Sequence, residues 1–170
     1  SLLFLGLSTI KTSVPDLRET PEVLAFIQNW TSFGFGSTVI FVVVGTILTL
    51  VLQSSSATMA ITLIMLNQGW IPFEMGAAMV LGENIGTTIT ANIAAAMGNA
   101  NARRAALAHT VFNLFGVIWV LCVFHWFVGT ICELWEVPFT PGKSSGEVSA
   151  TSLNAILATF HTAFNVCNVL

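Results

Sequence analysis

Long apolar runs, separated by a few short polar clusters, dominate the chain. Four long stretches contain no charged residue, at 23–73, 84–102, 105–132 and 148–170. A helix needs about 20 apolar residues to cross the roughly 30 Å hydrocarbon core of a bilayer. Within hydrocarbon, a helix satisfies all of its own backbone polar groups. The pattern therefore predicts an all-α, polytopic helical membrane protein.

The polar clusters divide the chain into six predicted segments. The first three are the end of a leading helix with an interfacial helix, a helical hairpin, and a broken helix, at 1–35, 36–71 and 72–98. The last three are a transmembrane helix, an extracytoplasmic loop, and the start of a final transmembrane helix, at 99–131, 132–147 and 148–170. Arg103 and Arg104 lie in a short loop, and short cytoplasmic loops are enriched in Lys and Arg. We therefore expect that loop in the cytoplasm and the loop at 132–147 on the other side of the membrane.

A cluster of four polar residues, Gln53 to Ser56, lies in the middle of the longest uncharged stretch. The apolar run before it, 37–52, would form a helix of about 24 Å at roughly 1.5 Å per residue, which is shorter than the hydrocarbon core. We therefore expect a re-entrant helical hairpin that turns inside the protein at this cluster. The alternative is one long tilted helix with a polar band.

A second polar cluster, Gly82 to Thr90, combines two glycines, a carboxylate, an amide and three threonines. Apolar residues flank it on both sides, and the two flanks together are about one membrane crossing long. The cluster therefore predicts a crossing helix that is broken midway. Irregular backbone at membrane depth is tolerated only where protein or a polar cavity satisfies it.

Composition excludes several classes of protein. Apolar residues make up 55% of the chain and charged residues only 8%, whereas soluble domains carry about 25% charged residues. Five Lys and Arg with a net charge of −3 form no basic patch, so nucleic acid is not an expected partner. The sequence contains no HExxH or CxxC motif, so we do not expect an enzyme.

Interrupted helices are how many secondary transporters build substrate and ion sites. The start of a half-helix exposes free N–H groups and suits an anion. Ser54, Ser55 and Ser56 lie at the predicted start of the second hairpin arm, and Thr87 and Thr88 at the predicted second half-helix. The serines also fit a second interpretation, in which small polar residues pack between helices.

Energetics favour a bound cation beside such an anion. A helix N-terminus contributes about 0.3–1 kcal/mol, and up to about 2 kcal/mol when it is partly buried. Removing an ionised group from water costs several kcal/mol. No Lys or Arg lies within 23–73 to offset that cost. Bound cations are the plausible compensation, and anion and Na⁺ would then stabilise each other's binding, as coupled transport requires.

Glu83 is the carboxylate within the second polar cluster. Ionisable residues inside membrane segments are functional candidates by default, because they are costly to place there. Glu83 could bind a cation or hold a proton. The alternative is a hydrogen-bonded structural carboxylate.

A short motif occurs twice, as His109-Thr110-Val111-Phe112-Asn113 and as His161-Thr162-Ala163-Phe164-Asn165. The His and Asn of each copy are four residues apart and so share one helix face. Imidazole and amide alone are a poor metal-ligand set. We therefore interpret the repeat as a pair of interhelical hydrogen-bonding positions that fix packing.

These motifs resemble the type II sodium–phosphate cotransporter family, in particular its bacterial branch. The resemblance covers roughly 36–117 and rests on motifs of matching order and spacing. They are Gln53-Ser54-Ser55-Ser56-Ala57-Thr58, the run from Leu81 to Ala91, Arg103-Arg104-Ala105, and His109 with Phe112-Asn113. The resemblance implies two inverted repeats, each with one QSSS hairpin and one broken helix. This chain contains one of them and looks more like the second.

The resemblance also implies a site. It implies that substrate and ions bind at Gln53, Ser54, Ser55, Ser56, Asn84, Thr87 and Thr88, and we add Glu83 to these residues. Na⁺ is expected to contact Gln53, Ser55, Asn84 and Thr87. Supporting roles are expected for Thr58, Thr90, His109 and Asn113. Glu83 departs from the small residue expected at its position, which bears on ion stoichiometry, on proton involvement and on which anion is carried.

The expected function is sodium-coupled transport of inorganic phosphate, with this chain as one half of the transporter. Na⁺ is the coupling ion, and no organic cofactor is expected. The expected partners are phosphate, the missing repeat of the same polypeptide, the lipid bilayer and a second copy in a homo-oligomer. The expected location is a bacterial inner membrane. The alternatives are the same fold carrying another anion or coupled to protons, and a non-transporting component that packs helices or binds a regulatory partner.

Overall fold

A computed structural model describes residues 30, 31, 33–139 and 149–169, and within these ranges every regular element is an α-helix. The helices are α3 (Phe35–Leu52), α4 (Ser55–Asn67), α5 (Phe73–Ala96), α6 (Ala100–Cys122), α7 (Phe124–Leu134) and α8 (Ala150–Val169). Two of them, α3 and α6, are long and apolar enough to cross a membrane, with mean hydropathies of 2.4 and 1.8. The predicted class, a helical membrane protein, is confirmed.

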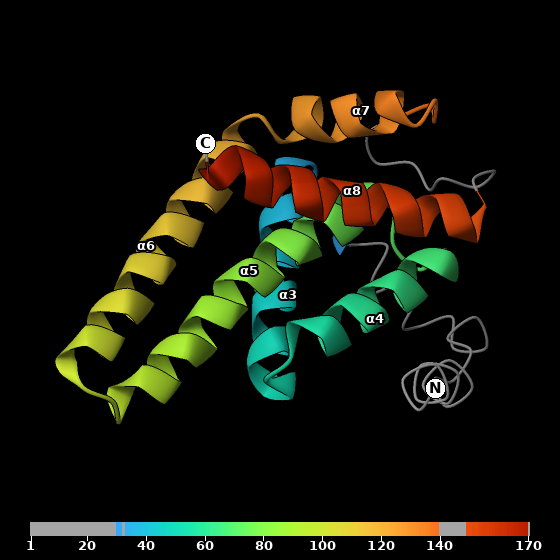
Figure 1. The fold of residues 1–170 in the computed structure, drawn as a ribbon. Coiled ribbons are helices and arrows are strands. Elements are labelled where there is room, and N and C mark those ends of the chain that lie inside the picture. Colours follow the sequence, from blue (N-terminus) through green and yellow to red (C-terminus); the bar gives the residue numbers. More distant parts are fainter. Residues whose placement is uncertain (1–29, 32, 140–148, 170) are drawn as a thin grey trace.

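Helix α5 lies at the centre of the arrangement and contacts α3, α4, α6 and α8. Figure 1 shows α5 beside α6, to which a short turn joins it, while α8 crosses over α5 at its other end and α7 lies next to α8. The outer face of α3 exposes large apolar side chains at every fourth position: Phe35, Val39, Val43, Ile47 and Val51. Such a face suits lipid or another apolar helix.

The chain turns between α3 and α4 at Gln53 and Ser54. Gln53 adopts a left-handed conformation, with φ of 51°, which ends α3. The hydroxyl of Thr49 on α3 donates to that of Thr58 on α4 across 3.2 Å and ties the two arms together beside the turn. The helix–turn–helix therefore lies where the polar cluster indicated, and the single tilted helix does not form. Its re-entrant placement in a membrane stays a prediction.

The predicted break in the next helix is wrong, because α5 runs without interruption from Phe73 to Ala96. The polar side chains of the cluster bond back to their own helix instead of breaking it. The amide of Asn84 donates to the Val80 carbonyl across 2.8 Å, and the hydroxyl of Thr87 donates to the Glu83 carbonyl across 2.8 Å. Thr87 and Thr88 therefore do not lie at a helix start, and the anion-binding role expected there on that ground is withdrawn.

Glycines in this cluster allow α5 to approach α3 closely. A Cβ atom on Gly82 would meet backbone atoms of α3, including the carbonyl oxygen of Val42, and one on Gly86 would lie 2.6 Å from the Cβ of Thr49. The two glycines are four residues apart, the spacing of small residues at close helix–helix contacts in membranes. Because α3 and α5 lie so close together, the hydroxyl of Thr46 on α3 donates to the Gly82 carbonyl on α5 across 3.1 Å.

The transmembrane helix predicted over 99–131 is in fact two helices. Helix α6 ends at Cys122, Val123 leaves the helical conformation with φ of −115° and ψ of 20°, and α7 continues to Leu134, inside the predicted loop. The bend lets α7 bury its apolar face, and the rings of Phe127 and Phe160 meet edge to face with centroids 5.4 Å apart. Nε2 of His125 also lies 2.8 Å from a carboxylate oxygen of Glu74 on α5.

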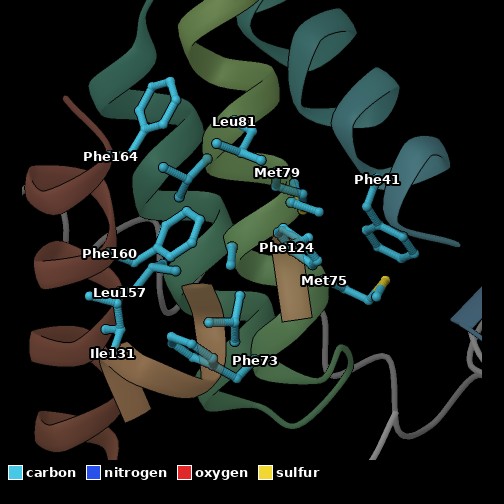
Figure 2. Packing of buried hydrophobic residues seen from close by; sticks show 14 of the residues in the cluster. Phe41, Phe73, Met75, Met79, Leu81, Phe124, Ile131, Leu157, Phe160 and Phe164 are labelled. Carbon is cyan, nitrogen blue, oxygen red and sulfur yellow. The ribbon is translucent and has the colours of Figure 1, made fainter. Parts of the chain in front are cut away.

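The apolar core lies where the first half of α5 meets α3, α7 and α8. Figure 2 shows Phe160 and Phe164 of α8 directed toward this helix, with Phe124 of α7 and Leu81 of α5 nearby. All four of these side chains are fully buried. Most of the predicted segment 1–35 and half of the predicted loop 132–147 lie outside the described residues, and the final helix is described as Ala150–Val169.

Candidate functional site

A cavity of about 230 Å³ lies where the start of α4, the middle of α5, and helices α6 and α8 meet. Eight of its ten lining residues have polar side chains, with hydroxyl, amide, imidazole and carboxyl groups. The lining residues are Ser55, Glu83, Asn84, Thr87, His109, Phe112, Asn113, His161, Asn165 and Val169. They include no Lys or Arg, so any anion held here lacks a permanently charged partner among the described residues.

The three serines at the turn have different surroundings. Ser54 is the N-cap of α4, and its hydroxyl oxygen accepts from the N–H of Ala57 across 3.3 Å. Ser55 occupies the first helical position and lines the cavity. Ser56 is exposed, and so is Gln53 at the apex, and neither lines the cavity. The cap therefore has a structural role, while Ser55 is placed to contact a ligand.

We expect Ser54→Ala to lower the stability of the protein by about 1 kcal/mol, because the substitution removes an N-cap acceptor from α4. Ser54→Asn supplies an equivalent acceptor and should restore most of that stability. The measurement is the thermal unfolding midpoint of the two variants and the parent in the same detergent. Equal midpoints for the parent and Ser54→Ala would contradict the capping role.

Glu83 is almost fully buried on α5, with 2% of its surface exposed. The hydroxyl of Thr62 on α4 lies 3.1 Å from its Oε1 atom, and this is the one hydrogen bond of the carboxyl group within the described part of the chain. The second oxygen, Oε2, has no hydrogen-bond partner among the described residues. It is not fully buried, so part of its surface remains accessible. Glu83 lines the cavity, so its carboxyl group is a candidate contact for a ligand there.

Three asparagines of the wall are oriented in the same way. The side-chain NH₂ groups of Asn84, Asn113 and Asn165 each donate one hydrogen bond to a carbonyl four residues earlier, across 2.8, 3.0 and 2.8 Å. Each amide keeps its carbonyl oxygen and its second N–H for other contacts. The hydroxyl of Thr87 likewise donates to its own helix and keeps lone pairs to offer. The wall therefore supplies oxygen acceptors for a cation and N–H donors for an anion.

The repeated motif gathers at this cavity instead of forming the interhelical hydrogen bonds that were expected. In the part of the chain that the structure describes, Asn113 and Asn165 bond to the carbonyls of His109 and His161 on their own helices. Both histidines line the cavity, one from α6 and one from α8. Among the described residues, no three His, Cys, Asp or Glu side chains form a metal-binding group.

The predicted site residues separate into two groups. The structure brings Ser55, Glu83, Asn84, Thr87, His109 and Asn113 together at the cavity. It places the other predicted residues outside the cavity wall: Gln53, Ser54, Ser56, Thr58, Thr88 and Thr90. Sequence reasoning did not assign His161 and Asn165 to the site, and the signal that pointed to them was the second copy of the repeat.

Comparison with known proteins identifies one family model and several curated relatives. A family model described as Na⁺/Pi-cotransporter matches residues 2–133. The uncharacterized protein YqeW of Bacillus subtilis is 35% identical over 118 residues, which cover 68% of this chain and 36% of that protein. The sodium-dependent phosphate transport protein 2C of Mus musculus is 40% identical over 94 residues, which cover 52% of this chain and 16% of that protein.

A further relative is the putative inorganic phosphate export protein YjbB of Escherichia coli, 26% identical over 133 residues, which cover 78% of this chain and 24% of that protein. The chain thus spans about a third or less of the length of these relatives. No solved structure matches the chain.

Proposed function

The chain belongs to the Na⁺/Pi-cotransporter family, and on that premise we propose that it forms one half of a membrane transporter that couples inorganic phosphate to Na⁺. The observation that supports this most is the cavity, which joins oxygen acceptors and N–H donors from four helices without a Lys or Arg in its wall. A site of this kind suits an anion and a cation that bind together.

The charge balance explains why Na⁺ is needed. Burying an ionised phosphate costs several kcal/mol, and the start of α4 returns at most about 2 kcal/mol. A Na⁺ ion in the same cavity would supply the missing positive charge. Each ligand then raises the affinity for the other by the same factor, because such a linkage is reciprocal. This linkage is the thermodynamic basis of coupled transport.

We assign the Na⁺ contacts to Ser55, Asn84 and Thr87, which line the cavity with hydroxyl and amide oxygens. Hydroxyl and amide oxygens suit a hard cation. Gln53 and Ser56 lie exposed at the apex of the hairpin, where a second hairpin of the other repeat would meet them. The other half of the site comes from that repeat or, if the protein has only one repeat, from a second copy in a homo-oligomer.

We place the transporter in a bacterial inner membrane, with α3 and α6 crossing the bilayer. The relatives' names leave the direction of transport open, because one is named a sodium-dependent transport protein and another a putative export protein. A sodium gradient directed inward would drive uptake.

Ligand-dependent unfolding tests the paired binding. The protein at its full native length is melted in detergent with phosphate in Na⁺ buffer, with phosphate in K⁺ buffer, and with each cation alone. A ligand at about 100 times its dissociation constant stabilises the folded state by about 2.7 kcal/mol. We expect phosphate to raise the midpoint in Na⁺ and to leave it unchanged in K⁺. Equal shifts in the two buffers would contradict Na⁺-linked binding.

A further inference from the structure

We propose that Glu83 makes the site selective for oxyanions that carry a proton, by accepting a hydrogen bond from the P–OH group of hydrogenphosphate. Phosphate and arsenate would then bind, whereas sulfate, which has no proton near neutral pH, would be rejected. The inference rests on the proposed function, because it takes the cavity to be the anion site. It assigns a specificity-determining role to one side chain of that cavity.

The position of Glu83 carries the inference. The side chain is held by the hydroxyl of Thr62 at Oε1, while Oε2 is unpartnered among the described residues and accessible. A buried polar oxygen without a partner costs about 1–3 kcal/mol, and more if it is charged. A ligand that donates a hydrogen bond to Oε2 removes that cost. Burial alone would favour the protonated carboxyl group, but the Na⁺ ion that the proposed function places in the same cavity favours the ionised form. The ionised carboxylate then favours a donor over a second acceptor.

The rest of the wall cannot take over this role. The titratable groups that line the cavity are Glu83 of α5, His109 of α6 and His161 of α8, and α4 contributes the neutral Ser55. A neutral imidazole offers one N–H donor, and each asparagine keeps one N–H free. These groups serve the unprotonated oxygens of a tetrahedral anion. Glu83 is the acidic group of the wall, so an anion that has no proton to donate would face it with like charge.

The expected discrimination follows from the strength of such a contact. A hydrogen bond to a charged group contributes about 1.5–3 kcal/mol, which corresponds to roughly 10–150-fold in affinity. Sites built to bond a substrate hydroxyl also reject the analogue that lacks it, because the protein group is then left unpaired. Protonated and unprotonated oxyanions of the same size should therefore differ by about 10-fold or more.

The test measures competition against phosphate uptake, with the protein at full native length in proteoliposomes under a Na⁺ gradient near neutral pH. The competitors are arsenate, sulfate and monofluorophosphate, which has the shape and charge of hydrogenphosphate but carries fluorine in place of the hydroxyl. In the parent protein, arsenate should compete well and the other two about 10-fold or more weakly. In Glu83→Gln this difference should shrink about 10-fold, because a neutral amide accepts more weakly and can also donate.

Glu74→Gln is the matched control. Glu74 is also a buried glutamate of α5, but it lies at the helix start beside His125 and not at the cavity. We expect its anion selectivity to equal that of the parent. A Glu83→Gln variant with parental selectivity and an altered Na⁺ dependence would show that Glu83 serves the cation, and would overturn the proposal.

Measurements on the parent protein alone also test the role of the P–OH group, so the proposal remains testable if the Glu83 variant does not fold. Equal competition by arsenate and monofluorophosphate in the parent would refute a role for the P–OH group, even though phosphate transport itself would stand. Absence of phosphate uptake by folded, inserted parent protein would instead contradict the proposed function.

Discussion

Gly82→Val is expected to remove most of the folded protein from the membrane. Any side chain at this position meets backbone atoms of α3, among them the amide nitrogen of Thr46 at 2.8 Å and the carbonyl oxygen of Val42. Backbone atoms inside a helix cannot move aside, so α3 and α5 must separate. Overpacking of this kind costs about 1–3 kcal/mol. Loss of the bond from the Thr46 hydroxyl to the Gly82 carbonyl adds about 1 kcal/mol.

A loss of several kcal/mol is large against a total stability of about 5–15 kcal/mol. The measurement is the amount of monodisperse protein in detergent extracts and its unfolding midpoint. Gly36→Ala is the matched control, because Gly36 lies on α3 and its nearest neighbour to an added Cβ, that of Phe33, is at an ordinary 3.5 Å. This control should fold normally, since alanine favours a helix over glycine by about 1 kcal/mol. A normal yield and midpoint for Gly82→Val would refute the close packing of α3 and α5.

Ser55→Ala is expected to reduce phosphate transport by about 10-fold or more while leaving the amount of protein in the membrane unchanged. Its hydroxyl lines the cavity at the start of α4, and it has no hydrogen-bond partner among the described residues. Removing it breaks no hydrogen bond within the described part of the chain. It does remove a group that would form a hydrogen bond with a charged ligand, and such a bond contributes about 1.5–3 kcal/mol to binding.

The measurement is phosphate uptake per folded molecule in proteoliposomes, for the parent, for Ser55→Ala and for the control variant Ser152→Ala. Ser152 pairs with Ser149 at the start of α8, away from the cavity wall, so its loss should leave transport at the parental rate. If Ser55→Ala instead lowers abundance and spares the transport rate per molecule, the serine packs helices and does not contact the ligand.

Local sequence was sufficient for the hairpin but not for the continuity of the longer helices. The polar cluster at Gln53 marks a real turn, because the serine that follows caps α4. The glycines and threonines after Leu81 looked like a similar interruption. They form a close helix–helix contact instead, and which role a glycine takes depends on the partner helix. The bend at Val123 has no Gly or Pro beside it, and it follows from the burial of α7 against α8.

The sequence identified many of the residues that line the cavity, but not how the helices bring them together. Serine, glutamate, asparagine and threonine on α4 and α5 were chosen for their chemistry, and four of them line the cavity. His161 and Asn165 reach the same cavity because α8 crosses α5, which no local pattern shows (Figure 1). The repeated His and Asn motif was the one sequence feature that linked α8 to α6.

Sodium-driven phosphate uptake tests the central claim most directly. The protein at its full native length is reconstituted in proteoliposomes, and labelled phosphate is followed with Na⁺ outside and with K⁺ in its place. We expect accumulation with Na⁺, background uptake with K⁺, and inhibition by excess arsenate. Uptake that is the same under both cations, or absent under both from folded and inserted protein, would contradict sodium-coupled phosphate transport.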